Sequence, residues 1–467
     1  MLRPEKSCRI KGGSGYSLAP MTTRVAERLQ REVIKAGICT GCGACVALDA
    51  SGRSSMTDTS CGPVPYFPQD VHLPELAWTV CPGKGVPYAA LYRRHYGHTP
   101  ENWLLGCFKA VRTGYSAIPE IRQAGASGGV ISHVLIHLME TGRIDAAVVV
   151  RQGVPEPERA RAVLATTKDE ILAASQSVYI PVSVLDILPR LEPGKRYAMT
   201  CLPDQAAALR QLQAAGHPRA LQIQYVLGPY TGTAIYPAAI ACYLQSKGVA
   251  PGTDRVESLK WRAGEWPGYM EVRMASGKVF RSKKFYYNFL MPFFVTQASL
   301  QSVDFANEFA DLSVGDAWSP RFESLGGGHS VIVTRTEAIE AIVREMEGKG
   351  LLTTEPEDPI QALAMHGHMM DFKKRGGFIR NRMRRFFGRR APVYDVRPER
   401  MAVSRLMVEL VVSGLFLVGS TRMARWMVAR VPEKVIGPVF NRLRLIWKAM
   451  SKPTKRKSLG TMKMVEA

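Results

Sequence analysis

Three cysteines stand close together near the N-terminal end of the chain. Cys39, Cys42 and Cys45 are separated by two residues each, and Gly41 and Gly43 lie between them. This spacing lets three thiolates converge on three iron corners of one cubane, while the glycines let backbone N–H groups approach the inorganic sulfides. The pattern therefore predicts ligands of a [4Fe–4S] cluster.

A fourth thiolate must come from another part of the chain. Cys81 is favoured because Pro82 follows it, and a Cys-Pro pair commonly supplies the closing ligand in ferredoxins. Cys61 is the alternative, and the choice between the two stays open. Structural zinc and disulfides are the other uses of clustered cysteines. Zinc is disfavoured because its sites usually combine two cysteine pairs, or one pair with two histidines.

A second candidate site is a run of small residues, Gly125, Ala126, Ser127, Gly128 and Gly129, ahead of a helical pattern that extends to residue 140. We expect the helix to begin near Ser127, with this serine as its N-cap. Free N–H groups at a helix start attract phosphate or a flavin anion, and glycines permit close approach. An ordinary helix cap with glycines for packing is the competing interpretation.

The elements that must position these residues form an alternating pattern from about Val111 onward. Helical segments are predicted at 127–140, 184–191, 203–215 and 235–247, and strands at 146–150, 196–200 and 220–227. Such alternation is typical of an α/β core. Residues 269–282 instead resemble an antiparallel hairpin. Near these elements, Lys260, Arg262, Trp266, Asp316 and Trp318 are weaker candidates for contacts to a flavin or an anion.

The charge is concentrated at one end of the chain. The net charge is +22, and residues 371–467 carry 24 Lys and Arg against 6 Asp and Glu, a net charge of +18. A basic and apolar segment of this kind favours an anionic membrane surface, with an acidic protein such as ferredoxin as the alternative. Nucleic acid is not expected as a partner, because no recognition fold accompanies the charge. Residues 451–467 are expected to be disordered.

The location of the protein is also predicted from composition. Residues 1–20 lack the apolar segment of a secretory signal, and no run of 18 apolar residues spans a membrane without interruption. We therefore expect a cytoplasmic protein that is peripheral on the cytoplasmic face of the membrane. In a reducing compartment the clustered cysteines, among nine in the chain, are expected to serve as metal ligands rather than as disulfides, whereas Cys201 and Cys242 are expected to be buried, inert thiols.

Taken together, these residues resemble the beta-subunit family of coenzyme F420 hydrogenases and dehydrogenases. The matching motifs occur in family order: Cys39 to Cys45, Cys81-Pro82-Gly83, Gly125 to Gly129, Tyr179-Ile180-Pro181, Cys201-Leu202-Pro203, Glu265-Trp266-Pro267-Gly268 and Ala310 to Trp318. The resemblance covers roughly residues 30–345. It implies FAD and at least one [4Fe–4S] cluster, with Gly125 to Gly129 in contact with the flavin. Many members carry a further cysteine pair where this chain has Ser299 and Ser302, so a second cluster is doubtful here.

Composition and pattern along the chain, together with the resemblance, divide the sequence into four expected segments. They are a flexible N-terminus at 1–25, a ferredoxin-like [4Fe–4S] domain at 26–110, a mixed α/β flavin-binding core at 111–370 and a basic, amphipathic helical extension at 371–467. The expected function is an oxidoreductase that passes electrons between the cluster and FAD, acting on an organic small molecule. Ferredoxin or reduced deazaflavin coenzyme F420 would be the outside redox partner. The alternative is a non-catalytic electron-relay subunit of a larger membrane-associated complex.

Overall fold

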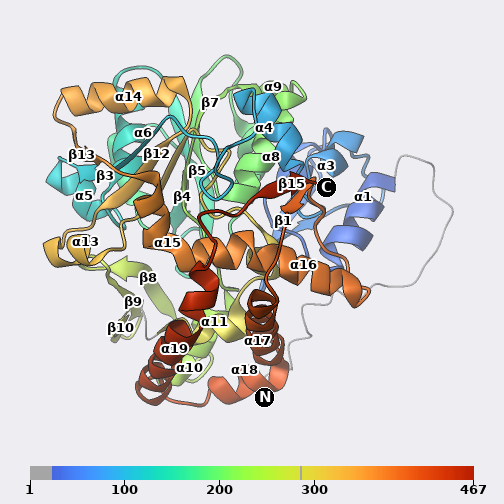
Figure 1. The fold of residues 1–467 in the computed structure, drawn as a ribbon, viewed down its shortest axis with the longest axis vertical. Helices are drawn as coiled ribbons and strands as arrows, with labels where there is room; N and C mark the ends of the chain where they lie inside the picture. The colour runs from blue at the N-terminus through green and yellow to red at the C-terminus, as the bar shows by residue number, and fades with distance from the viewer. Residues whose placement is uncertain (1–23, 284–286) are drawn as a thin grey trace.

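The fold was analysed in a computed structural model, which describes residues 24–283 and 287–467 (Figure 1). The expectation for residues 1–25 falls almost entirely outside these ranges. An eight-stranded mixed sheet organises the molecule. Its order across the sheet is β13 (Leu352–Pro356), β3 (Ala110–Ser116), β12 (Ser330–Thr334), β11 (Leu312–Asp316), β7 (Ile223–Pro229), β6 (Tyr197–Thr200), β4 (Ala146–Gln152) and β5 (Ala160–Ala165).

Four neighbouring strands of this sheet are parallel. β11 pairs with β7, β7 with β6, and β6 with β4 in parallel register, whereas the strands at both sides pair antiparallel. Parallel strands require crossover helices, which cover the sheet on its two faces. The mixed α/β class predicted from the sequence is therefore confirmed.

Alternate residues of the strands face two different cores. In β4, Ala146 and Val148 pack into one apolar cluster, while Ala147 and Val149 pack into the other. This is the period-two pattern of a strand buried on both faces. The helices of the first core are α8 (Pro203–Ala214), α9 (Pro218–Leu221) and the 3-10 helix η2 (Leu185–Arg190), and those of the second are α5 (Pro119–Ala124), α6 (Val130–Glu140), α7 (Lys168–Ala173) and α14 (Glu337–Gly348).

The cysteine region packs onto the first of these cores. Its elements are α1 (Arg24–Leu29), the π-helix η1 (Gln30–Ile34), α2 (Ala44–Ala47), the antiparallel pair β1 (Ser55–Thr59) and β2 (Gly62–Tyr66), α3 (Glu75–Thr79) and α4 (Tyr88–Tyr96). Val33, Cys42 and Tyr92 of this region belong to the same buried cluster as Met199 and Val226 of the sheet. The cysteine loop is thus fixed against the large sheet by shared packing.

A smaller sheet and several short helices complete the middle of the chain. The predicted hairpin is present as β9 (Tyr269–Met274) and β10 (Val279–Lys283), with β8 (Val256–Ala263) as a third antiparallel strand. The surrounding helices are α10 (Ala238–Ser246), η3 (Tyr287–Leu290), α11 (Met291–Phe294), α12 (Gln297–Gln301) and α13 (Pro320–Leu325). Helix α10 and the small sheet bury a third apolar cluster between them.

The C-terminal part is helical, and three of its helices lie together at the lower end of the molecule in Figure 1. Its elements are α15 (Pro359–Lys374), α16 (Gly376–Phe386), β14 (Val396–Pro398), α17 (Val403–Gly419), α18 (Arg422–Val428), α19 (Glu433–Arg456) and β15 (Met464–Glu466). The expected disorder of residues 451–467 is wrong. Helix α19 continues to Arg456, and β15 pairs with β14, so backbone hydrogen bonds hold this end of the chain.

Candidate functional site: a cysteine loop beside a cavity

The structure brings four thiols together, of which Cys42 is buried and Cys39, Cys45 and Cys81 are half-buried. Burial raises the pKa of the Cys39 thiol to about 12, and the nearby Cys81 thiol adds to this rise. The pKa of Cys45 is raised well above its ordinary value, first by burial and then by repulsion from Cys42, Cys39 and Cys81. Cys81 therefore belongs to the same group although it is far away in sequence. Cys61, the alternative fourth ligand, is disulfide-bonded in this structure.

The four thiols are not arranged around a single metal ion. Within the two described ranges, no three His, Cys, Asp or Glu side chains are grouped as they would be around one metal ion. Four thiolates on one zinc would each stand about 2.3 Å from the metal and would crowd together. A cubane instead carries one iron at each of four corners, so its thiolates stand farther apart. Positive charge from irons would also reverse the rise in thiol pKa.

Two glycines let the cysteine loop lie flat against its neighbours. Gly41 and Gly43 have φ angles of 69° and 89°, which L-residues with side chains rarely adopt. A Cβ atom at Gly43 would stand 2.7 Å from the Asp186 nitrogen and closer still to Ser183 Oγ. The loop can therefore rest on residues 183–186 only with glycine at this position.

The closing cysteine reaches the loop through another close backbone contact. Cys81 follows helix α3, and a Cβ atom at Gly83 would stand 2.7 Å from the carbonyl oxygen of Ile38. Ile38 is the residue directly before Cys39. The Cys81-Pro82-Gly83 turn is thus held against the start of the cysteine loop.

A cavity of about 480 Å³ opens beside the cysteine loop, at the carboxyl ends of the four parallel strands. Val149, Thr200, Pro229 and Asp316 line it from β4, β6, β7 and β11, respectively. Ligands of open α/β sheets usually bind at this edge, where strand order reverses and loops diverge. The cavity therefore lies where the topology favours a ligand, and its apolar lining suits a flat aromatic ring system.

One short segment connects the cavity with the cysteine loop. The backbone N–H groups of Val184 and Leu185 donate hydrogen bonds to the carbonyl oxygen of Cys42, at 3.3 Å and 2.9 Å. Val182 and Val184 also line the cavity. The wall of the cavity and the support of the cysteine loop are therefore the same stretch of chain.

The glycine-rich run lines the same cavity, but its details differ from the prediction. Helix α6 begins at Val130, its N-cap is Gly129 with φ of 71°, and Ser127 does not cap it. Ser127 Oγ instead donates a hydrogen bond to the carbonyl oxygen of His329 at 2.8 Å. The N-cap prediction was wrong because Gly128 and Gly129 turn the chain sharply, which moves the helix start downstream. Gly125, Ala126, Ser127 and Gly129 still line the cavity.

The glycines of this run are needed for packing. Cβ atoms at Gly128 and Gly129 would stand 2.7 Å and 2.6 Å from the carbonyl oxygens of Gly114 and Ile121. The competing interpretation, glycines that pack a helix start, thus holds for these two positions. The feature available to a ligand is the N-terminus of α6, where Val130, Ile131 and Ser132 line the cavity and the first N–H groups lack intrahelical partners.

A tyrosine that the sequence analysis missed also points to a ligand. Tyr230 lines the cavity, and its buried hydroxyl has no hydrogen-bond partner among the described residues. A buried hydroxyl without a partner is costly, so this group is expected to be satisfied by a bound molecule. The position of Tyr230 just after the carboxyl end of β7 was the signal that could have identified it.

A second cavity, of about 700 Å³, adjoins the first across Gly125, Ala126 and Ser127. The weaker candidates Lys260, Arg262 and Trp266 line this second cavity, and Arg262 lines both. Arg262 and Asp316 form an ion pair at 2.9 Å, with both side chains mostly buried. The rings of Trp266 and Trp318 pack with centroids 4.6 Å apart. The structure thus gathers all five weaker candidates at the border of the two cavities.

The serines that stand in place of a cysteine pair have structural partners. Ser299 Oγ accepts hydrogen bonds from the Ala234 N–H at 2.9 Å and from Thr296 Oγ1 at 2.7 Å. Ser302 Oγ donates to Asp204 at 3.0 Å. Lys373 of α15 also covers this position by donating to the carbonyl oxygen of Ser299 at 2.8 Å. Both serines are thus part of the hydrogen-bond network around α12.

Two family models match the chain. One describes the N-terminal part of the coenzyme F420 hydrogenase/dehydrogenase beta subunit and matches residues 111–189, and the other describes its C terminus and matches residues 194–360. Together these matches span more than half of the chain. The protein belongs to this family. The cysteine region and helices α16 to α19 lie outside the two ranges of this chain that the family models match.

Individual relatives of this beta-subunit family member are distant. The coenzyme F420-dependent sulfite reductase of Methanocaldococcus jannaschii is 26% identical over 267 residues, which are 54% of this chain and 39% of that protein. The coenzyme F420 hydrogenase subunit beta of Methanothermobacter thermautotrophicus is 22% identical over 275 residues, 55% of this chain and 88% of the relative. The chain thus spans less than half the length of the sulfite reductase. Both relatives are redox proteins by name.

A solved structure has a similar fold. A chain of the F420-reducing [NiFe] hydrogenase complex from Methanosarcina barkeri superposes with a TM-score of 0.50 and is 18% identical. The superposition covers 63% of this chain and 98% of that one. At this identity the similarity supports the fold.

Proposed function

We propose that this protein is an iron–sulfur flavoprotein that transfers electrons between a [4Fe–4S] cluster and FAD. Cys39, Cys42, Cys45 and Cys81 would hold the cluster, and the cavity at the N-terminus of α6 would hold the flavin. A bound cluster exchanges single electrons, whereas a bound flavin stores two and delivers them as a hydride. Ferredoxin or reduced coenzyme F420 would be the outside redox partner, and an organic small molecule the substrate.

The observation that carries this proposal is the shared segment at residues 182–185. The Val184 N–H donates a hydrogen bond to the carbonyl oxygen of Cys42, and Val184 also lines the cavity. The rate of electron transfer between two centres falls steeply with their separation. A single layer of backbone between the thiol group and the cavity therefore provides a short path.

Each part of the site has a defined task in this proposal. The four thiolates would bind the irons, and the backbone N–H groups around Gly41 and Gly43 would face the cluster. The first N–H groups of α6 and the Tyr230 hydroxyl would donate hydrogen bonds to the flavin. The Arg262–Asp316 ion pair would hold one positive and one negative charge in fixed positions between the two cavities. Apolar residues such as Val182 would exclude water from the path between the two centres.

The test is anaerobic purification followed by iron, zinc and flavin analysis of the wild type and of cysteine variants. We expect about four irons and one FAD per chain. Cys42→Ser and Cys81→Ser should lose the iron, while Cys242→Ser, a buried thiol far from the loop, should retain it as the matched control. Zinc without iron, or full iron content in Cys81→Ser, would contradict the cluster assignment.

A second candidate function is that of an electron-relay subunit. It is favoured by two similar proteins, one of which is a hydrogenase beta subunit and the other a chain of a hydrogenase complex. Turnover of a small substrate by the isolated chain would exclude this alternative. A partner that co-purifies in a fixed ratio and is needed for turnover would support it.

A further inference from the structure

The outer surface of α17, α18 and α19 is unusually apolar. Among the described residues, most of the large apolar side chains that are exposed to solvent belong to positions 403–450. We call this surface the C-terminal apolar face. Its members are Val403, Leu406, Met407, Leu410, Val411, Leu415, Leu417, Val418, Met423, Trp426, Met427, Val435, Val439, Leu443, Leu445, Ile446 and Met450.

Within residues 403–450, the charges exposed on this face are all positive. The only carboxylates in the sequence between 403 and 450, Glu409 and Glu433, are buried and paired with Arg405 and Lys247, respectively. The exposed charged residues of this stretch are Arg422, Arg430, Lys434, Arg442 and Lys448. A cationic border around an apolar centre is complementary to lipid headgroups above acyl chains.

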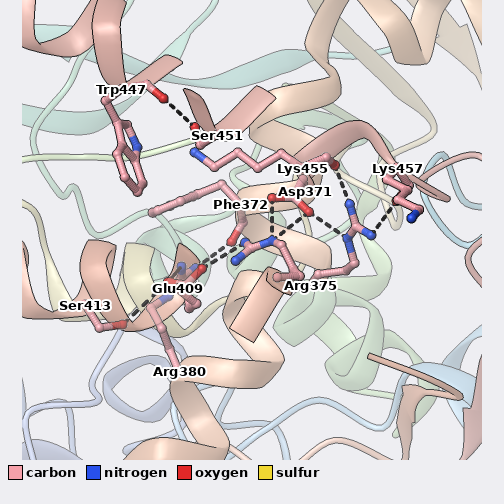
Figure 2. A network of polar contacts seen from close by, with 11 residues as sticks. Asp371, Phe372, Arg375, Arg380, Glu409, Ser413, Trp447, Ser451, Lys455 and Lys457 are labelled. Carbon is pink, nitrogen blue, oxygen red and sulfur yellow. Dashed lines mark hydrogen bonds and ion pairs between the residues drawn. The ribbon is translucent and has the colours of Figure 1, made fainter. Parts of the chain in front are cut away.

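A buried network of ion pairs holds α17 with its polar side inward (Figure 2). Asp371 accepts hydrogen bonds from Arg375 at 2.6 Å and from Arg405 at 2.9 Å and 3.0 Å. Glu409 pairs with Arg405 at 2.8 Å and with Arg380 at 2.7 Å. A surface helix of a globular protein normally buries its apolar side. Helix α17 instead buries Arg405 and Glu409, whose charges are met by ion pairs with Asp371 and Arg380.

We propose that the C-terminal apolar face binds the surface of an anionic lipid bilayer. Within the described residues, no single helix is long and apolar enough to cross a membrane. Helices α17 and α18 meet that criterion only as a pair, with an angle of 78° between them. The face therefore lies along the bilayer surface, with its apolar side chains among the upper acyl chains and its cations at the headgroups.

This orientation places the bilayer next to one wall of the cavity. Met291 and Met369 line the cavity and also pack in one apolar cluster with Phe416 of α17 and Trp447 of α19. A bilayer bound to the face would lie on the far side of these four side chains. The proposal does not depend on the redox function, because it rests on the surface alone.

The first experiment is flotation of the full-length protein with vesicles. One set contains phosphatidylcholine alone and the other contains added phosphatidylglycerol. We expect the protein to float with the anionic vesicles, to float poorly with the neutral ones, and to be released as salt is raised, since headgroup attraction is screened. Equal flotation with both lipids, or none with either, would overturn the proposal.

Matched variants separate this face from the rest of the surface. Two variants should each lower the partitioning of the protein onto anionic vesicles at least about tenfold. The first carries Val418→Glu with Met423→Glu, and the second carries Arg422→Glu, Arg430→Glu and Lys434→Glu. The control changes are Leu325→Glu with Ile360→Glu, and Arg321→Glu with Lys349→Glu, at exposed positions elsewhere. These should leave partitioning unchanged, and a similar loss in the controls would contradict the assignment.

A spectroscopic readout tests the depth of binding without relying on a loss of function. Trp426 lies on the face with 57% of its surface exposed. Brominated lipids should quench its fluorescence, and Trp426→Phe should remove most of the quenching. If the face instead joins two copies of this chain, sedimentation would show a dimer that Val418→Glu abolishes, with no quenching, and the bilayer would be excluded.

Discussion

The cysteine region and the C-terminal helices are fixed to the same α/β body in two different ways. Around the cysteine loop, glycines allow backbone to touch backbone, and the four thiols and the buried Tyr230 hydroxyl are the groups that we propose for ligand binding. At the C-terminal helices, buried charges pair with one another, and the side left open is apolar. The comparison teaches that the first region is prepared for small groups inside the protein and the second for a surface outside it.

The largest expected effect comes from breaking the charge network of the C-terminal helices. Arg405→Met leaves Asp371 and Glu409 buried without their shared partner. Removing one member of a buried ion pair typically costs about 3–5 kcal/mol. We expect urea denaturation to show a loss of this size, whereas Arg400→Met, at an exposed position, should change stability by less than about 0.5 kcal/mol. Equal effects of the two changes would contradict the structural role of the network.

A pH effect should follow from another buried contact of the C-terminal part. Burial raises the pKa of Glu308 from 4.5 to about 7, although Lys374 of α15 pairs with it. The folded state therefore holds this proton more tightly than the unfolded state. The contribution of this proton to the free energy of unfolding is complete below pH 4.5, and it is lost as the pH rises through 7.

The matched protein for this pH test is Glu308→Gln, which cannot ionise. The free energy of unfolding of the wild type, minus that of the variant, should fall by up to about 3 kcal/mol across this interval. Urea midpoints measured at several pH values provide the comparison. A constant difference would show that Glu308 has an ordinary pKa.

The cysteine region should respond to backbone changes rather than to charge. Gly43→Ala adds a Cβ atom against Ser183 and Asp186 at a residue with φ of 89°. We expect a loss of at least about 2 kcal/mol and lower iron content. Gly52→Ala is the control. Gly52 also has a positive φ, of 66°, but the space at its Cβ position is open. The control variant therefore has the backbone strain of Gly43→Ala without its steric clash. Full iron retention in Gly43→Ala would argue against the docked loop.

The smallest effect is expected from Tyr230→Phe. The lost hydroxyl has no partner among the described residues, so the protein without ligand should be as stable as the wild type or slightly more so. The affinity for FAD should fall by the equivalent of about 1 kcal/mol, a factor of about five to ten. Titration calorimetry with FAD and a thermal melt measure the two quantities. Unchanged FAD affinity would remove Tyr230 from the proposed site.

Much of the fold was predictable because the strands and helices carry strong local signals. Strand β4, helix α8 and the β9–β10 hairpin agree with their predictions within two residues at nearly every end. Predictions failed where local signals competed with tertiary contacts. The start of α6 was misplaced because the chain turns at Gly129 before the helix begins, and Ser127 bonds to His329, which is distant in sequence, instead of capping the helix. The end of the chain was expected to be disordered, but β15 pairs antiparallel with β14, and Val396 stands opposite Glu466, a partner that is distant in sequence.

The sequence by itself determined the α/β class, the three clustered cysteines and the basic character of the C-terminal part. These are properties of residue type and short spacing, which need no knowledge of distant contacts. Only the tertiary structure decided that Cys81 joins the thiol group, that residues 182–185 connect this group with the cavity, and that α17 turns its apolar side outward. Each of these depends on which segments pack together, and packing is a property of the whole chain.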